Sequence, residues 1–108
     1  MSAIEIEQGS GNVFADIGLP EADEMLVKAQ LAAKIGDIIK HRHLSQEQAA
    51  EILGMPQPKI SNMLRGKFRG ISEAKMLECL TRLGRDVQIV VKLTRTKRKV
   101  GNLEVVFS

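Results

Sequence analysis

The sequence holds 108 residues, which is enough for one domain with a single hydrophobic core. Hydrophobic residues make up 44% and charged residues 27%; no apolar run approaches the roughly 20 residues of a membrane-spanning helix, and no signal-peptide pattern opens the chain. The single cysteine excludes an intrachain disulfide and favours a cytoplasmic location, and the lack of Trp and Tyr argues against a protein that stacks RNA or single-stranded bases on aromatic side chains.

The charges are unevenly distributed along the chain. The formal net charge of the whole chain is +3. Residues 1–27 have a net charge of −6 and contain no Lys or Arg, whereas the rest of the chain has 16 basic and seven acidic residues. A basic body would attract phosphate, and an acidic leader would attract a basic partner. The alternative is that both are ordinary solvated surface.

Residues 1–19 are predicted to form an acidic, loosely ordered arm, because they contain several glycines and little hydrophobic periodicity. Val13 and Phe14 are the one apolar anchor in this arm. Pro20 then suits the first turn of a helix over residues 21–41, in which apolar side chains recur at three-and-four spacing and basic residues follow at the end. Gly36 in that helix marks a point of close packing.

Three further helices are predicted before residue 85. Ser45 and Gln48 form a capping-box pattern for a helix over residues 46–53, which ends at Gly54. A helix over residues 57–65 ends at Gly66 and is followed by a basic loop, Lys67 to Gly70. Ser72 caps the last helix, which ends at Gly84. Together with the first helix these form a predicted helical domain over residues 20–85.

The periodicity changes after Arg85. Apolar and polar residues alternate from Val87 to Leu93, and Leu103 to Phe107 can form a second strand, so residues 86–108 are predicted to be a β-strand or β-hairpin. An exposed apolar edge strand seeks a partner, so this segment is predicted to dimerise the protein. The residues predicted to pair the two chains are Val87, Ile89, Val90 and Val91. The alternative is pairing with residues 103–107 of the same chain.

The segment from Gln46 to Gly66 has the spacing of a helix-turn-helix. Two short helices flank Gly54, with small Ala50 four residues before it and Ile60 and Met63 on the inner face of the second helix. No carboxylate occurs between Gln57 and Lys67, while amides and cations are plentiful, which suits insertion between two rows of phosphates. The alternative is an ordinary helical hairpin with a basic outer face.

These segments resemble a known family. The sequence LSQEQAAEILGMPQPKISNMLRGK (residues 44–67) resembles the helix-turn-helix of Cro/cI-type (XRE) regulators, and the flanking sequences GNVFADIGLPEADEMLVKAQLA and LGRDVQIVVK extend a narrower resemblance to HigA-type antitoxins of type II toxin–antitoxin modules over residues 12–92. The resemblance implies a mainly α, five-helix, lambda-repressor-like DNA-binding domain. It also implies a dimer that binds an inverted repeat at its own promoter and neutralises a small ribonuclease toxin. Residues 93–108 lie outside it.

The resemblance also implies site residues. Base contacts are placed on Gln57, Pro58, Lys59, Ser61 and Asn62, and phosphate contacts on Ser45, Gln46, Arg65, Lys67 and Arg69. A phosphate at Ser45 and Gln46 has an independent physical reason, since helix N-termini attract anions. Pro56 departs from the family pattern, because it stands where a Ser or Thr commonly caps the second helix.

Three alternatives to this function stay open. A stand-alone or phage-type XRE repressor without a toxin has the same domain, and a protein-interaction adaptor predicts no salt-dependent DNA binding. If a toxin exists, either the acidic arm or the helical body can hold it. An enzyme, a metal site and a cofactor are not expected, because Glu47 and Glu51 have no accompanying nucleophile or base, and His41 and His43 point apart at a helix end, far from Cys79.

Overall fold

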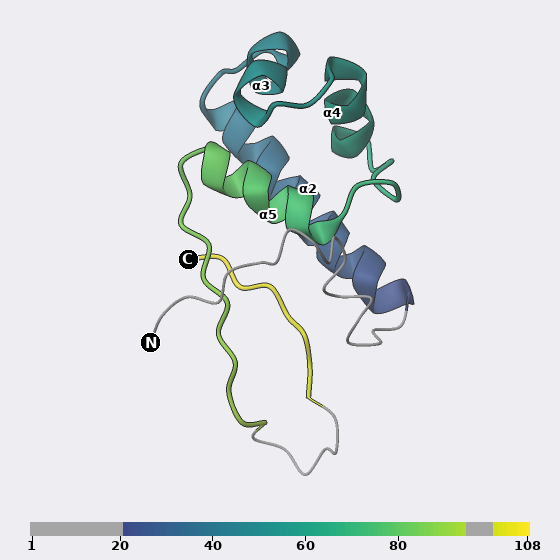
Figure 1. Ribbon diagram of the computed structural model, residues 1–108, viewed down its shortest axis with the longest axis vertical. Helices are drawn as coiled ribbons and strands as arrows, with labels where there is room; N and C mark the ends of the chain where they lie inside the picture. The colour runs from purple at the N-terminus through teal and green to yellow at the C-terminus, as the bar shows by residue number, and fades with distance from the viewer. Residues whose placement is uncertain (1–20, 95–100) are drawn as a thin grey trace.

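The computed structural model describes residues 21–94 and 101–108 (Figure 1). This part of the chain contains α2 (Glu21–His41), α3 (Gln46–Leu53), α4 (Gln57–Leu64) and α5 (Glu73–Arg82), followed by irregular extended segments. The four helices confirm the helices predicted from periodicity and caps, to within one residue at each end. None of them combines the length and apolarity needed to cross a bilayer.

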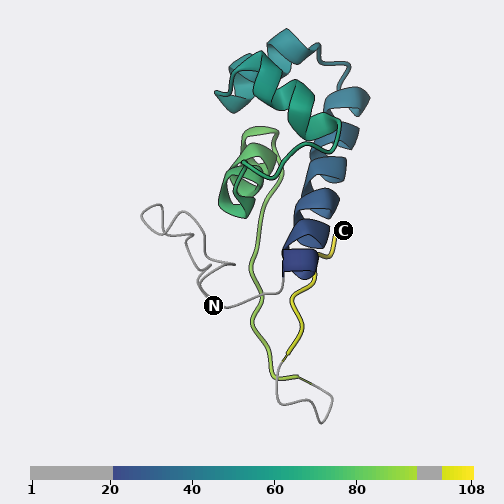
Figure 2. The same cartoon turned by 90° about the vertical axis from the view of Figure 1, so that its right-hand side faces the viewer.

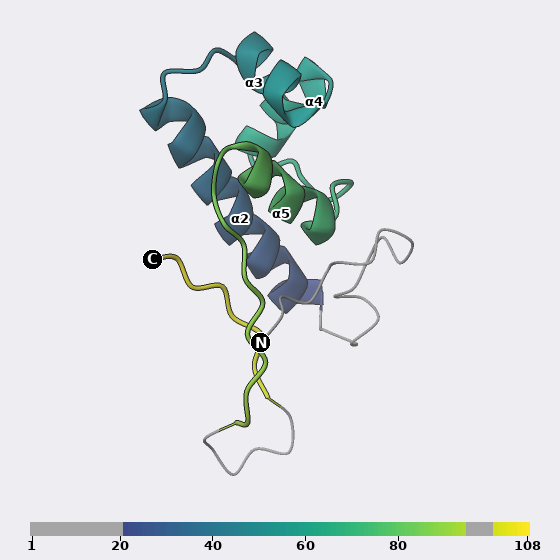
Figure 3. The ribbon, with the colours of Figure 1, turned by 60° about the vertical axis from the view of Figure 1, so that its left-hand side comes forward.

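The long helix α2 organises the fold. Helix α5 packs along α2, and α3 and α4 pack on each other over one end of that pair (Figures 1 and 3). Gly36 marks the place where α4 comes nearest, since a Cβ atom built on it would lie 3.3 Å from Cδ2 of Leu64. The predicted close packing point in α2 is therefore confirmed.

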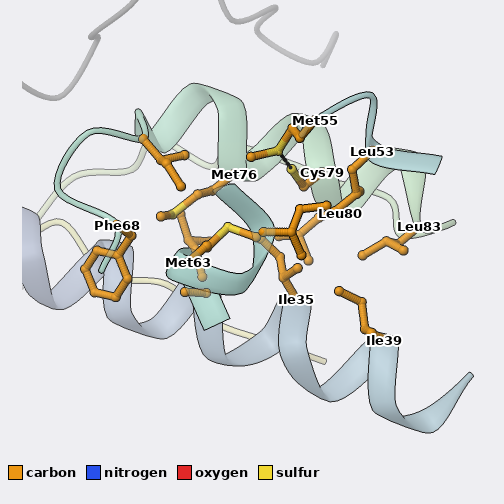
Figure 4. Packing of buried hydrophobic residues seen from close by; sticks show 14 of the residues in the cluster. Ile35, Ile39, Leu53, Met55, Met63, Phe68, Met76, Cys79, Leu80 and Leu83 are labelled. Carbon is orange, nitrogen blue, oxygen red and sulfur yellow. Dashed lines mark hydrogen bonds between the residues drawn. The ribbon is translucent and has the colours of Figure 1, made fainter. Parts of the chain in front are cut away.

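One hydrophobic core lies between the four helices (Figure 4). Ile35 of α2, Leu53 of α3, Ile60 of α4 and Met76 of α5 are each inaccessible to solvent. Full burial of such a side chain contributes about 1.5–3 kcal/mol. Because every helix supplies at least one of these side chains, the relative positions of α3 and α4 are set by the core and not by the turn alone.

Local hydrogen bonds fix where two of the helices begin. Ser45 Oγ accepts a hydrogen bond from the backbone N–H of Gln48 at 3.1 Å, and the Ser45 N–H donates to Gln48 Oε1 at 2.8 Å. The predicted capping box is thus confirmed. Ser72 likewise accepts from the N–H of Lys75 at 3.1 Å and caps α5. These caps use donors that the helical hydrogen-bond pattern leaves unpaired.

Two features of the predicted fold are wrong for the described residues. Four helices are present there, not five, and neither residues 86–94 nor residues 101–108 form a strand or hairpin. Residues 86–94 instead run as an extended trace away from the α3–α4 end, and residues 101–108 return toward the helices as a second extended trace (Figures 1 and 2). A two-stranded ribbon is marginal in water, and here helical surface takes the place of a neighbouring strand.

The alternating apolar pattern of the C-terminal region has a different origin. Val87 and Ile89 are half-buried while Gln88 and Val90 are exposed, and Val87 packs against the helical core. On the returning segment Val105 packs against the same core, and the ring of Phe107 lies 5.4 Å from Nζ of Lys34. An extended segment lying on a helical body buries every second side chain, just as a strand on a core does.

Candidate nucleic-acid interface

The turn between α3 and α4 depends on Gly54. This residue adopts left-handed backbone angles (φ 64°, ψ 35°), and its N–H donates to the carbonyl oxygen of Ala50. Arg82 of α5 lies beneath the turn, where its Nη1 donates to the Ile52 carbonyl oxygen at 3.4 Å. A Cβ atom on Gly54 would lie 3.2 Å from that nitrogen. The turn therefore needs glycine for its conformation, and a Cβ atom would also require a small shift of the Arg82 side chain.

Helix α4 presents two different faces. Ile60 and Met63 are buried in the core, whereas Gln57, Pro58 and Lys59 are exposed at the beginning of the helix. The two remaining residues predicted to contact bases, Ser61 and Asn62, are half-buried. All five lie on α4 itself, so the structure places them within two turns of one helix.

The N-terminus of α4 lacks a side-chain cap. Pro56 occupies the capping position with φ −59° and makes no side-chain hydrogen bond, and Pro58 in the first turn has no N–H. The N–H groups of Lys59 and Ile60 donate to the Pro56 carbonyl oxygen at 3.0 and 3.2 Å. Few backbone donors are thus left at this end, so side chains must supply most contacts to a ligand here.

Asn62 and Arg65 are directly joined. Arg65 Nη2 donates to Asn62 Oδ1 at 2.7 Å, one turn along α4. The sequence predicts separate roles for these residues, a base contact and a phosphate contact. The structure brings them together as one hydrogen-bonded unit in which the amide oxygen orients the guanidinium group. Residues three apart on a helix are neighbours, so the spacing alone could have suggested this pair.

The loop from Lys67 to Gly70 is held at both ends. The Lys67 N–H donates to the Asn62 carbonyl oxygen at 2.8 Å, and the Ile71 N–H donates to the Phe68 carbonyl oxygen at 2.9 Å. Phe68 is buried, while Lys67 and Arg69 are exposed. The loop therefore follows α4 directly and carries two cations on a backbone that is anchored by a buried aromatic ring.

The beginning of α3 carries the other predicted phosphate contacts. Ser45 and Gln46 are both exposed there. The capping box uses the N–H of Gln48, so the N–H groups of the preceding first-turn residues remain at the positive end of the helix. These N–H groups can donate hydrogen bonds to a phosphate oxygen.

Comparison with known proteins agrees with this geometry. A family model described as a helix-turn-helix domain matches residues 13–92. A solved structure described as "Putative XRE Family Transcriptional Regulator" shares 34% sequence identity and a TM-score of 0.77, and the match covers 82% of this chain and 100% of that chain. The comparison with curated proteins gives no match.

The chain belongs to the XRE helix-turn-helix family. Its fold is that of a DNA-binding transcriptional regulator, with α3 and α4 as the two helices of the motif. The alternative of an ordinary helical hairpin is thereby set aside. The helix-turn-helix predicted from the spacing around Gly54 is confirmed.

The residues predicted to dimerise this XRE-family protein fall into two sets. Val87 and Ile89 are half-buried on the protein's own helices, whereas Val90 and Val91 are 65% and 71% exposed. Leu93 is 91% exposed on the same segment. The described segment thus offers an apolar surface from Val90 onward, displaced from α3 and α4 (Figure 2).

The fold also gathers cations that the sequence analysis treated separately. An open hollow at the C-terminal end of α2 is lined by basic side chains together with Asp37 and Ile38; the basic residues are Lys34, Lys40, His41, His43 and Arg85. Arg42 lies between His41 and His43 in the sequence, and its Nη1 donates to the Leu83 carbonyl oxygen at 3.3 Å. No group of three or more metal-ligating side chains occurs in the described ranges. Periodicity could not find this hollow, because Arg85 approaches α2 only in the folded chain.

Proposed function

We propose that this XRE-family protein is the antitoxin and autorepressor of a HigBA-like toxin–antitoxin module, and that it binds an inverted-repeat operator as a homodimer. The observation that carries the DNA-binding part is the exposed beginning of α4, where Gln57 and Lys59 stand on a helix without a carboxylate. The antitoxin part is supported by the sequence resemblance over residues 12–92 and by the acidic residues 1–27.

In this proposal α4 enters the major groove and reads base edges. Amide side chains can contact adenine, and Lys59 can contact guanine. The base-contacting set is Gln57, Pro58, Lys59, Ser61 and Asn62. Ser45 and Gln46 bind one phosphate at the beginning of α3, and Arg65, Lys67 and Arg69 bind phosphates beyond the end of α4. Contacts from both motif helices would fix the angle at which α4 lies in the groove.

A homodimer is needed because one such module buries too little surface to select a genomic site. Two copies reading half-sites about 34 Å apart double the contacts, and the symmetry of the dimer matches that of an inverted repeat. The exposed apolar side chains of Val90 and Val91 support pairing of the two chains through the C-terminal segment. Such pairing would also supply the neighbouring strand that residues 86–94 lack in the single chain.

The toxin is proposed to be a small, basic ribonuclease held by the acidic arm, residues 1–19. This arm lies outside the described residues, and the proposal rests on its sequence: it carries Glu5, Glu7 and Asp16 and the apolar pair Val13 and Phe14. Acidic side chains attract a basic partner, and one apolar anchor gives the contact a fixed register.

The DNA-binding part is tested by titrating the full chain against its own upstream DNA and against a scrambled duplex over a salt series. Preferential binding with a steep salt slope is expected. Asn62→Ala should cost about 1–3 kcal/mol on the operator and relax specificity at one position, whereas Lys67→Ala should weaken binding to both duplexes alike and lower the slope by about one unit. Equal losses on both duplexes for both variants would contradict this division of roles.

The antitoxin part is tested by co-expression with the small reading frame next to the gene. Protection of cells and a stable complex are expected for the full chain, and loss of both is expected on deletion of residues 1–19. Protection without residues 1–19 would place the toxin on the helical body. Operator binding in the absence of any growth-inhibiting neighbour would instead identify a stand-alone repressor.

A further inference from the structure

A buried ion pair joins α2 to the beginning of α5. Lys28 and Glu73 are 5% and 1% exposed, and Lys28 Nζ lies 3.3 Å from Glu73 Oε1. Charged residues are almost never so deeply buried unless they are paired. Neither residue is among the predicted DNA contacts, and none of the sequence patterns singled the pair out.

The pair is poorly built for stability alone. Neither oxygen of the Glu73 carboxylate accepts a hydrogen bond within the described part of the chain. Burial raises the pKa of Glu73, and Glu24 adds to this effect, while Lys28 acts in the opposite direction. Buried ion pairs with unsatisfied oxygens are often matched or exceeded in stability by apolar replacements. A reason other than stability for a cation at this position is therefore worth seeking.

The hydrogen bond of Lys28 supplies that reason. Its Nζ donates to the backbone carbonyl oxygen of Arg69 at 3.1 Å, across 41 residues of sequence. Arg69 stands in the Lys67–Gly70 loop as the second residue of the turn that the hydrogen bond from the Ile71 N–H to the Phe68 carbonyl oxygen closes, so its own carbonyl remains available to Lys28. A cation donating to this carbonyl fixes the loop at the point where its exposed cations branch off.

We propose that Lys28 is a positioning residue for DNA binding: it holds the Arg69 carbonyl so that Lys67 and Arg69 face the phosphate backbone, and Glu73 balances the buried ammonium charge. This inference rests on the proposed DNA contacts of that loop. Lys28 itself, being buried, touches no DNA. Its effect on binding is to reduce the conformational freedom that the loop would otherwise lose when the complex forms.

The test removes the donor without leaving an unpaired buried charge. Lys28→Met with Glu73→Gln replaces the pair by neutral side chains of similar length, and Lys28→Arg keeps the cation, the donor and the Glu73 partner. We expect the double variant to lose roughly tenfold in operator affinity near physiological salt and to lower the salt slope by about one to two units, since each phosphate contact contributes about 0.9. Lys28→Arg alone should retain most of the wild-type slope.

A thermodynamic cycle separates positioning from simple destabilisation. Lys67→Ala with Arg69→Ala removes the cations directly, and adding these changes to the double variant should cause little further loss, because the same contacts are already weakened. A core variant such as Ile39→Val provides a loss of stability on α2 without a change in slope. Full additivity, or a double variant with wild-type affinity and slope, would overturn the proposal.

Two further controls keep the result interpretable. If the variant with Lys28→Met and Glu73→Gln does not fold, Lys28→Leu with Glu73→Leu supplies an apolar replacement that also lacks the donor. The same outcomes apply to it. If wild-type protein shows no operator preference, the proposed function itself fails. If it does, but Lys67→Ala with Arg69→Ala leaves binding unchanged, the loop makes no phosphate contact and Lys28 has nothing to position.

Discussion

At the scale of single residues, the hydrogen bond between Arg65 and Asn62 couples two of the predicted DNA contacts at the end of α4. The 2.7 Å contact makes the guanidinium group and the amide act together. A side chain that is held in place before binding loses less entropy when it contacts DNA. Substitution of either partner therefore affects the other.

The first prediction follows from this coupling. Asn62→Ala and Arg65→Ala should each weaken operator binding, and the double variant should lose less than the summed single losses by about 0.5–3 kcal/mol. Binding titrations of the four proteins at one salt concentration measure this coupling. Lys59→Ala in place of Arg65→Ala is the matched control, since Lys59 is an exposed cation on the same helix. Strict additivity of Asn62 and Arg65 would show that they act independently on DNA.

The second prediction concerns the buried carboxyl of Glu73, whose pKa is raised above its ordinary value of 4.5, chiefly by burial. Because the folded state binds the Glu73 proton more tightly than the unfolded state does, protonation of Glu73 stabilises the fold. This stabilisation is complete below pH 4.5, the pKa in the unfolded chain, and is lost as the pH rises through the raised pKa of the folded state. Denaturant unfolding of wild type and Glu73→Gln across this range should show a stability difference that moves in favour of the variant as pH increases. A difference independent of pH would mean that the pKa of Glu73 is the same in both states.

At the scale of elements, the sharp connection between α3 and α4 is decided by one backbone conformation and one neighbour. Gly54 has φ 64°, and Nη1 of Arg82 on α5 would lie 3.2 Å from a Cβ atom at this position. The glycine was expected from the spacing of the helix-turn-helix. The arginine beneath it was not, because Arg82 ends α5 and lies 30 residues from Ile52 in the sequence.

The third prediction compares two glycines with positive φ, Gly54 at 64° and Gly84 at 89°. Gly54→Ala and Gly84→Ala both force alanine into the left-handed region, which costs about 1–2 kcal/mol, but a Cβ on Gly84 meets nothing within 4 Å. Gly54→Ala should therefore lower the free energy of unfolding by more than Gly84→Ala. Chemical denaturation of both variants gives the difference. Equal losses would mean that the Arg82 side chain moves aside without cost.

At the scale of the whole molecule, the C-terminal region is where the expected and observed structures part. Its alternating pattern predicted a strand or hairpin, and the single chain contains extended segments instead. Val87 and Val105 pack against the helical core, which satisfies one side of the pattern, while Val90, Val91 and Leu93 remain exposed. Exposed apolar side chains on an extended backbone are suited to pairing with a second copy.

The fourth prediction tests this pairing. In the proposed dimer, Val90→Lys with Val91→Lys should favour the monomer and reduce operator affinity, because charged side chains would replace the exposed apolar ones that the proposed interface buries. Sedimentation or light scattering measures the mass, and DNA titration measures the affinity. Gln88→Lys is the control, as an exposed polar position on the same segment. An unchanged dimer in the double variant would place the interface elsewhere.

The sequence by itself determined the four helices, the Ser45 and Ser72 caps and the helix-turn-helix around Gly54. These features depend on residues within about four positions of each other, so periodicity and capping chemistry are sufficient to predict them. Only the tertiary structure decided the contacts of Lys28 with Arg69 and Glu73. It also decided the hydrogen bond of Arg82 to the Ile52 carbonyl oxygen before the turn, and the packing of Val87 and Val105 on the helices. Those partners are tens of residues apart and meet only because one shared core fixes how the helices pack.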